Sequence, residues 1–120
     1  MRIVVPEHVD AEAIELLETQ AEVVYDPRLH EDANALTDAL RDASALIIRN
    51  KTFVGPDLLA QAPDLRVVGR VGVGLDNLDL PALRERGVVA TYAPGTNAVS
   101  VAEYVIGAIL EFRRGFARAS

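Results

Sequence analysis

The chain has 120 residues, half of them hydrophobic, which is enough for one domain with a core of its own. Its formal net charge is −6 and its basic residues are scattered along the chain, which argues against a nucleic-acid partner. It has no cysteine, and its two histidines, His8 and His30, lack the spacing of a metal pair, so we expect neither disulfides nor a metal site.

Five short β-rich runs alternate with helical patterns along the chain. Strands are expected at residues 2–5, 21–25, 45–49, 66–70 and 88–91. The third and fourth runs are continuously apolar, which is typical of strands covered on both faces by helices. This pattern indicates a parallel sheet, and we expect an open flavodoxin-like α/β fold with right-handed crossovers.

The segments between the strands have the period of amphipathic helices. Helices are expected at residues 11–19, 31–42, 57–61 and 80–86. Their ends carry suitable signals, with Asp10 at the N-cap of the first, Pro56 opening the third and Gly87 closing the fourth.

A longer helix is expected at residues 98–117, after a turn at Pro94 and Gly95. It is apolar on most sides and has more apolar surface than five strands can cover. No apolar run approaches the roughly 18 residues that span a bilayer, and no apolar signal segment begins the chain. We therefore expect a cytoplasmic protein without a membrane partner.

Ligands of open parallel sheets bind at the carboxyl ends of the strands. Arg49 and Lys51 follow the third strand and Arg70 ends the fourth, so three cations are expected on one rim of an otherwise acidic protein. This combination favours a small anion with carboxylate or phosphate groups. A single strand-end arginine is equally well explained as a solvated charge or an ion pair.

Two closely spaced glycines, Gly72 and Gly74, follow the fourth strand, and such glycines let backbone amides approach an anion. The segment begins like a dinucleotide fingerprint, but Asn77 stands in place of the third glycine and no acidic ribose ligand follows the next strand. We do not expect a dinucleotide site here. Asp76 and Asp79 flank a helix start, where capping explains them better than a metal pair.

Asn97 stands at the start of the last helix, where its side chain can cap the helix or contact a ligand, and the sequence favours neither role. His8 and His30 lie far from the glycines in sequence, and neither has an evident carboxylate partner nearby. We therefore expect no catalytic residue in this chain.

Two longer strings carry a family resemblance. Residues 69–79 read GRVGVGLDNLD and residues 94–103 read PGTNAVSVAE, and together they resemble the D-isomer-specific 2-hydroxyacid dehydrogenases. Residues 46–52, LIIRNKT, are similar to a third family segment, with Asn50 where a serine is usual. The resemblance runs the whole chain. An arginine at the position of Arg70 is most typical of the branch of this family that oxidises 3-phosphoglycerate to 3-phosphohydroxypyruvate in serine biosynthesis.

The resemblance implies a substrate site formed by Arg49, Asn50, Arg70, Val71, Gly72, Val73 and Asn97. In it Arg49 faces the substrate, backbone amides of residues 71–73 hold the substrate carboxylate, and Asn97 lies near the substrate and the nicotinamide. NAD is the implied cofactor of the complete enzyme. The family's own glycine fingerprint and catalytic residues have no match here, so we expect no tight cofactor binding to this chain.

The resemblance also implies an organisation of the chain. Residues 1–97 are expected to form a substrate-binding domain, and residues 98–120 a helix that leads to an absent cofactor domain and supports a homodimer. We expect this helix to pair with another chain, or to swap, and so to cover its apolar face. We therefore expect these residues alone to bind a small anionic 2-hydroxy or 2-oxo acid without hydride transfer.

Two alternatives belong to the class of binding modules. A flavodoxin-like receiver domain needs a phosphorylatable aspartate at the end of the third strand, where Arg49 stands, and this counts strongly against it. A standalone regulatory or scaffold domain would keep an anion pocket without turnover. It differs from the first interpretation mainly in whether a further coding region follows, which the sequence does not show.

Overall fold

The computed structural model describes residues 1–92 and 97–119, with side chains up to residue 112, so the expected turn at Pro94 and Gly95 lies outside the described residues. Five parallel strands form one sheet in the order β2-β1-β3-β4-β5. They are β1 (Arg2–Val5), β2 (Glu22–Tyr25), β3 (Ala45–Ile48), β4 (Val67–Arg70) and β5 (Val89–Thr91). The predicted flavodoxin-like order is confirmed, and the strand ends agree to within one residue.

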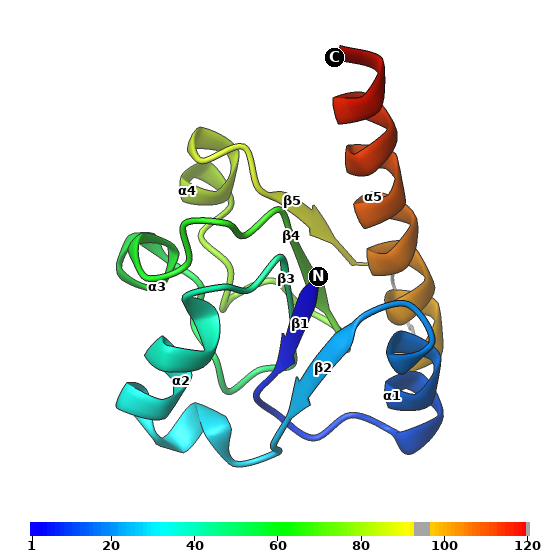
Figure 1. Cartoon of the computed structure of the whole chain (residues 1–120). Coiled ribbons are helices and arrows are strands. Elements are labelled where there is room, and N and C mark those ends of the chain that lie inside the picture. The colour runs from blue at the N-terminus through cyan, green and yellow to red at the C-terminus, as the bar shows by residue number, and fades with distance from the viewer. Residues whose placement is uncertain (93–96, 120) are drawn as a thin grey trace.

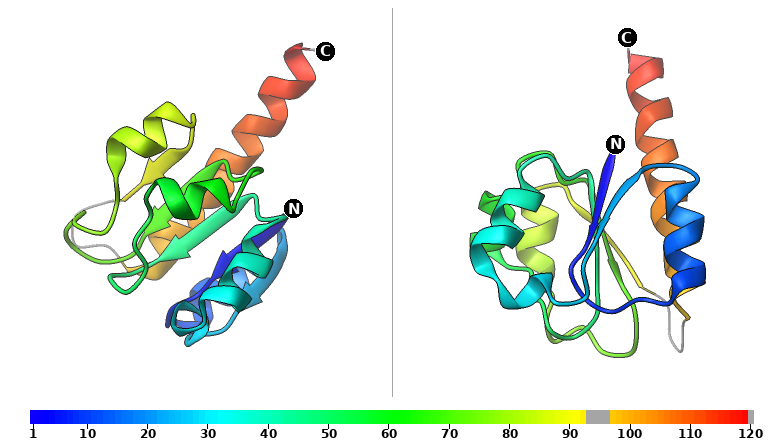
Figure 2. Two further views of the ribbon diagram at one scale, coloured as in Figure 1. Left: turned by 90° about the vertical axis from the view of Figure 1, so that its left-hand side faces the viewer. Right: turned by 60° about the horizontal axis from the view of Figure 1, so that its bottom comes forward.

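Helices cover both faces of the sheet, as Figures 1 and 2 show. On one face lie α1 (Ala11–Glu18) and α5 (Ala98–Ala119), and on the other lie α2 (Ala33–Leu40), α3 (Pro56–Ala60) and α4 (Leu80–Glu85). A short 3₁₀ turn, Leu29–Glu31, precedes α2. Two continuous apolar clusters fill the spaces between these layers.

Side chains and glycine set several helix ends. Asp32 accepts the amide of Ala35 at 3.1 Å, so α2 begins after Asp32 rather than at the predicted residue 31. Gly87, with φ of +70°, follows α4 as predicted. Asp10 occupies the N-cap position of α1 as predicted, although its side chain makes no capping hydrogen bond.

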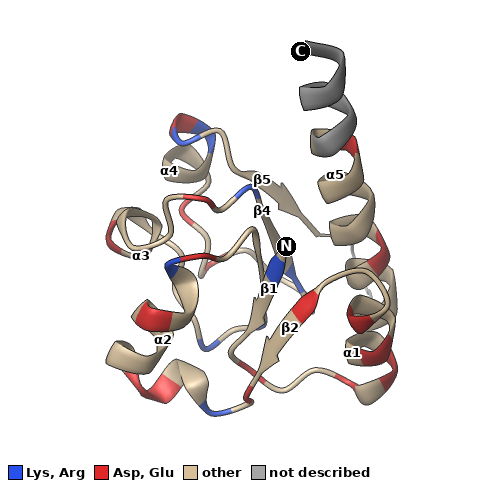
Figure 3. Cartoon of the chain, viewed as in Figure 1, with Lys and Arg blue, Asp and Glu red and all other residues tan. Residues whose placement is uncertain are grey.

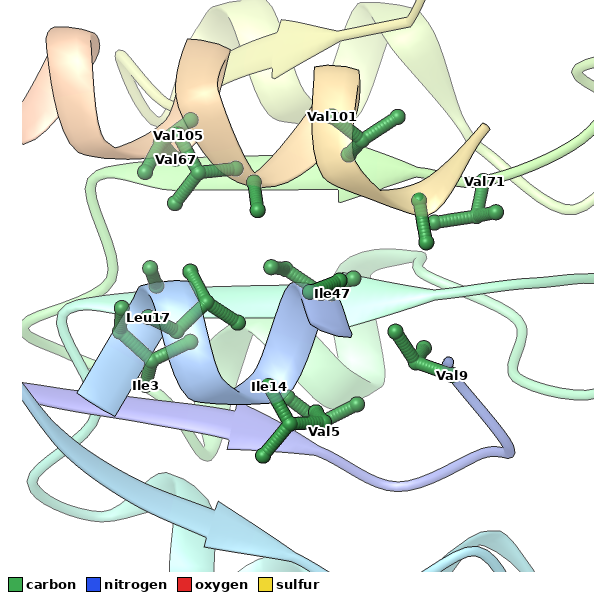
Figure 4. Close-up of a cluster of buried hydrophobic side chains, with 14 of the residues drawn as sticks. Ile3, Val5, Val9, Ile14, Leu17, Ile47, Val67, Val71, Val101 and Val105 are labelled. Carbon is green, nitrogen blue, oxygen red and sulfur yellow. The ribbon is translucent and has the colours of Figure 1, made fainter. Parts of the chain in front are cut away.

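The cluster between the sheet and α1 and α5 brings together side chains from distant segments, as Figure 4 shows. Val101 and Val105 of α5 are fully buried over β4. A methyl group at Gly69 would lie 2.8 Å from each of these valines, so a glycine there lets α5 lie directly against the sheet. The first part of α5 thus belongs to the core, and the expected division between residues 97 and 98 stays a prediction.

The surface carries uneven charge and some exposed apolar side chains. Figure 3 shows acidic residues along α1 and on and beside α2, in keeping with the net charge of −6.

On α5, Tyr104 is 58% exposed and Leu110 is 41% exposed, with Gly107 between them on the helix surface. Among the described residues no helix combines the length and apolar character needed to cross a bilayer.

Candidate functional site

Two loops at the carboxyl ends of β3 and β4 run side by side. Ile48 pairs with Arg70 in the parallel register, so the two loops leave the sheet at the same level. They meet again farther on, where Val54 bridges Leu78. We call residues 49–52 the arginine loop and residues 71–77 the glycine loop. The sequence predicts that these loops share one edge of the sheet, because parallel strands end together, and the structure confirms it.

A buried carboxylate from the segment after β1 organises the arginine loop. Glu7 is only 2% exposed. Its Oε2 atom accepts the backbone amides of Arg49 and Thr52, each at 3.0 Å, and its Oε1 atom accepts the amide of Lys51 at 2.9 Å. Three amides directed at one carboxylate hold this loop in a curve around it. In the sequence Glu7 is placed at the functional edge by the end of the first strand, but nothing local indicates these three contacts.

Asn77 joins the two loops. Its Nδ2 atom donates to the carbonyl oxygens of Arg49 at 2.6 Å and Thr52 at 2.8 Å, and its Oδ1 atom accepts from Arg70 Nε at 3.0 Å. In the sequence, Asn77 is apparent only as the residue that stands in place of a third glycine. The signal for this role is the residue type, because an asparagine between two adjacent polar loops is able to donate to one and accept from the other.

Arg70 turns into the glycine loop. It is 6% exposed, and its Nη1 and Nη2 atoms donate to the carbonyl oxygens of Val71 and Val73. Arg49, Asn50 and Lys51 are exposed at the rim. Two of the three expected cations therefore lie at the surface, while the third is buried behind the loop. The sequence does not show which of these cations is buried. Side chains alternate in direction only within a strand, and Arg49 and Lys51 lie beyond the end of β3.

The glycine loop exposes its backbone. Gly72 and Gly74 have φ values of +111° and +87°, which favour glycine, and Val73 is 75% exposed. Within residues 1–92 and 97–119, the amides of residues 72–74 donate to no protein acceptor. Three neighbouring free N–H groups at the surface are able to hold an anion.

Asn97 caps α5, since its Oδ1 atom accepts the amide of Ser100 at 2.8 Å. The next residue, Ala98, packs in the same apolar cluster as Val71. Asn97 therefore starts α5 close to the base of the glycine loop. Its expected contact with a substrate or a nicotinamide stays a prediction.

The surroundings of His8 differ from the expectation. Its Nε2 atom lies 3.9 Å from the Asp10 carboxylate and its Nδ1 atom lies 3.4 Å from the Tyr25 hydroxyl. The statement that His8 has no carboxylate nearby is therefore wrong, because the turn after β1 folds Asp10 back beside it. The side chains of His8 and Asp10 are 67% and 73% exposed, so a contact between them contributes little to stability.

The start of α4 does not offer the free amides that a pyrophosphate binds in a dinucleotide fingerprint. A pyrophosphate would need the free amides at the start of α4, but Asp79 accepts the amide of Ala82 there at 3.0 Å and brings a negative charge. Asp79 thus caps α4 as predicted. No group of three or more metal-ligating side chains lies close together within the described part of the chain.

Residues 3–117 match the family model described as the catalytic domain of the D-isomer specific 2-hydroxyacid dehydrogenases. The chain belongs to this family. It is 45% identical over 113 residues to the (S)-sulfolactate dehydrogenase of Chromohalobacter salexigens, and this match covers 94% of this chain and 37% of that protein. It is also 34% identical over 120 residues to the D-3-phosphoglycerate dehydrogenase of Methanocaldococcus jannaschii, and this match covers 100% of this chain and 22% of that protein.

Solved structures of similar fold include enzymes with bound cofactors. An NADPH-dependent glyoxylate/hydroxypyruvate reductase of Sinorhizobium meliloti, in complex with NADP and malonate, is 30% identical with a TM-score of 0.63, over 77% of this chain and 28% of that one. The NAD⁺-bound 3-phosphoglycerate dehydrogenase of Entamoeba histolytica, 21% identical with a TM-score of 0.63 over 75% of this chain and 32% of that one, shares the fold. Members of the family thus bind NAD or NADP.

These matches confirm the family resemblance predicted from residues 69–79 and 94–103. The chain spans about a third or less of the length of these relatives and structures. The relatives' names include different substrates, so family membership by itself leaves the substrate of this chain undetermined.

Proposed function

We propose that this chain forms the substrate-binding part of an NAD-dependent D-2-hydroxyacid dehydrogenase. The observation that carries the proposal is the pairing of the two loops. The glycine loop offers the free amides of residues 72–74, and Asn77 binds it to the arginine loop, which exposes Arg49 and Lys51. An anion at this rim meets backbone donors from one loop and cationic side chains from the other.

The chemistry of the rim suits a small acid with a carboxylate. The expected contact from the Val71 amide is wrong, because this amide donates to the carbonyl of Ile48 at 2.8 Å within the sheet. The amides of Gly72 and Val73 remain the proposed contacts of the carboxylate, and the guanidinium of Arg49 is able to bind it through two parallel hydrogen bonds. Asn50 and Asn97 are the proposed polar contacts to the remainder of the substrate and, for Asn97, to the nicotinamide. Arg70 contributes its charge from behind the glycine loop.

For the complete enzyme we propose 3-phosphoglycerate as the substrate, oxidised to 3-phosphohydroxypyruvate in serine biosynthesis. The support is Arg70 together with several relatives named D-3-phosphoglycerate dehydrogenase. Sulfolactate is a second candidate, because 45% identity links the chain to a sulfolactate dehydrogenase. Both acids carry a carboxylate, a 2-hydroxyl group and a second strong anion, and Lys51 is suitably exposed for that anion.

We further propose that these residues alone bind the acid without transferring hydride. Among the described residues His8 has a carboxylate neighbour, Asp10 at 3.9 Å, but both side chains are largely exposed and belong to the turn after β1 rather than to the two loops. In this proposal NAD binds a cofactor domain that these residues do not supply, and α5 pairs with α5 of a second chain in a homodimer. The exposed Tyr104 and Leu110 support that pairing.

Calorimetric titration tests the substrate proposal. The chain is titrated with 3-phosphoglycerate, sulfolactate and glyoxylate, beside Arg49→Gln and the control Arg41→Gln, which removes an exposed arginine paired with Asp38. We expect saturable binding that Arg49→Gln weakens about tenfold or more, because a charge-assisted bond is lost. Equal affinity in both variants, or no binding of any acid by the unmodified chain, would contradict the proposal.

A further inference from the structure

Arg70 contacts two alternate peptide groups of the glycine loop. Its Nη1 atom donates to the carbonyl of Val71 and its Nη2 atom to that of Val73 at 3.2 Å. Each carbonyl shares a planar peptide unit with the N–H group of the glycine that follows, Gly72 or Gly74. All peptide bonds of the described residues are trans, so C=O and N–H point in opposite directions. The amides of both glycines therefore point away from the guanidinium.

The packing around the glycines agrees with this direction. A methyl group placed on Gly72 would lie 2.7 Å from Arg70 Nη1, so the guanidinium fills the inner side of the loop. A methyl group on Gly74 would meet nothing within 4 Å. The inner side is thus closed by a cation and the outer side is open. An anion on the outer side meets two N–H groups whose peptide dipoles are aligned by the charge behind them.

Asn77 extends this arrangement to the arginine loop. Its Oδ1 atom accepts from Arg70 Nε, and its Nδ2 atom donates to the carbonyls of Arg49 and Thr52. The guanidinium and the arginine loop are therefore connected through one side chain. A shift of Arg70 would move both the amide donors and the backbone that carries Arg49.

We infer that Arg70 and Asn77 are positioning residues: Arg70 turns the amides of Gly72 and Gly74 toward the ligand, and Asn77 sets their position relative to Arg49. The identity of the ligand rests on the proposed function, whereas the orientation of the amides does not. In this role Arg70 acts through the backbone, which explains why a residue assigned to substrate binding is 6% exposed.

The variant Arg70→Lys tests the inference, because lysine keeps the charge but loses the planar set of directed donors. The matched control is Arg86→Lys, since Arg86 also donates to two backbone carbonyls, those of Leu59 and Ala62, outside the two loops. Labelling with ¹⁵N-glycine gives up to eight amide resonances, and the ligand-free spectra are compared first. Titrations with 3-phosphoglycerate and glyoxylate follow.

We expect Arg70→Lys to shift the Gly72 and Gly74 resonances without ligand and to weaken binding about tenfold. Arg86→Lys should leave both resonances and the affinity unchanged. Unshifted Gly72 and Gly74 resonances in Arg70→Lys would overturn the inference, as would equal losses of affinity in the two variants. If the unmodified chain binds neither acid, the proposed function fails, while the ligand-free spectra still decide the role of Arg70.

Asn77→Asp provides a second variant if Arg70→Lys does not fold. Aspartate keeps an acceptor for Arg70 Nε but faces the carbonyls of Arg49 and Thr52 with an oxygen instead of a donor. We expect the Gly72 and Gly74 resonances to stay near their original positions, with affinity reduced about tenfold because the arginine loop is released. Unchanged affinity in a folded Asn77→Asp chain would overturn the role assigned to Asn77.

Discussion

Glu7 and Lys51 are separated by 44 positions in the sequence, yet the Glu7 carboxylate accepts the Lys51 backbone amide at 2.9 Å. With the amides of Arg49 and Thr52, this bond ties the end of β1 to the loop after β3. The carboxylate is buried, so its bonds are formed away from water and are costly to lose. The shape of the arginine loop thus depends on a strand that is not its own.

Replacement of Glu7 by glutamine is expected to destabilise the chain. The single oxygen of the glutamine side chain is able to keep two of the three amides, but the NH₂ group then faces the third donor. We expect the free energy of unfolding to fall by about 2 kcal/mol, as for the loss of a buried charge-assisted hydrogen bond. Urea unfolding followed by circular dichroism measures this change.

The control for this variant is Glu22→Gln. The Glu22 side chain is 64% exposed and paired with Arg2, so its loss should cost less than about 1 kcal/mol. Similar losses for the two variants would show that the buried carboxylate has no special role in stability.

The two loop glycines should respond differently to alanine. Both adopt positive φ values, and each alanine costs about 1–2 kcal/mol of backbone strain. Gly72→Ala also places a methyl group 2.7 Å from Arg70 Nη1, whereas Gly74→Ala enters open space. We expect a larger loss of unfolding free energy and of ligand affinity in Gly72→Ala. Denaturation and calorimetry of both variants measure the difference, and equal effects would argue against the contact with Arg70.

A second pair of glycines tests the packing of α5. Gly69→Ala places a methyl group 2.8 Å from both Val101 and Val105, and we expect a loss of about 1–3 kcal/mol from overpacking. Gly107→Ala adds a methyl group with nothing within 4 Å, so we expect a gain of about 1 kcal/mol from helix propensity. Thermal unfolding distinguishes the two, and a stabilised Gly69→Ala chain would mean that α5 does not lie against β4 as described.

The strands and helices were predictable because each depends on local patterns. The continuously apolar β3 and β4 indicated a buried parallel sheet, and Gly87 marked the end of α4. The loops at the functional edge followed from the rule that parallel strands end together. The family strings added the proposed roles of Arg49 and the glycine loop.

The side-chain contacts of the site were not predictable in the same way. Glu7 is separated from its three amide partners by 42 to 45 positions, and no local pattern reports such a contact. Arg70 was expected at the rim because arginine is charged. Its guanidinium instead donates to two carbonyls of the glycine loop, whose backbone has positive φ values at two glycines that the sequence alone does not reveal. A sequence pattern indicates which residues share an edge, and long-range hydrogen bonds decide which side chains face outward.

The exposed side of α5 carries the prediction of a homodimer. Tyr104→Lys places a charge on an apolar side chain of this helix that is 58% exposed, more than any other large hydrophobic side chain in its described part, and should shift the chain toward monomer. Asn34→Lys, on the exposed surface of α2 across the sheet, is the control and should leave the oligomeric state unchanged. Light scattering over a range of concentrations measures the mass, and a clean monomer of the unmodified chain at high concentration would contradict the pairing.

We expect a small anionic acid to bind where the arginine and glycine loops meet. A heteronuclear NMR titration of the uniformly ¹⁵N-labelled chain with 3-phosphoglycerate tests this site. We expect saturable shifts that are largest for the amides of residues 49–52 and 72–74. Shifts confined to the opposite edge of the sheet, near residues 62–66, or no saturable shift with any of the acids, would contradict it.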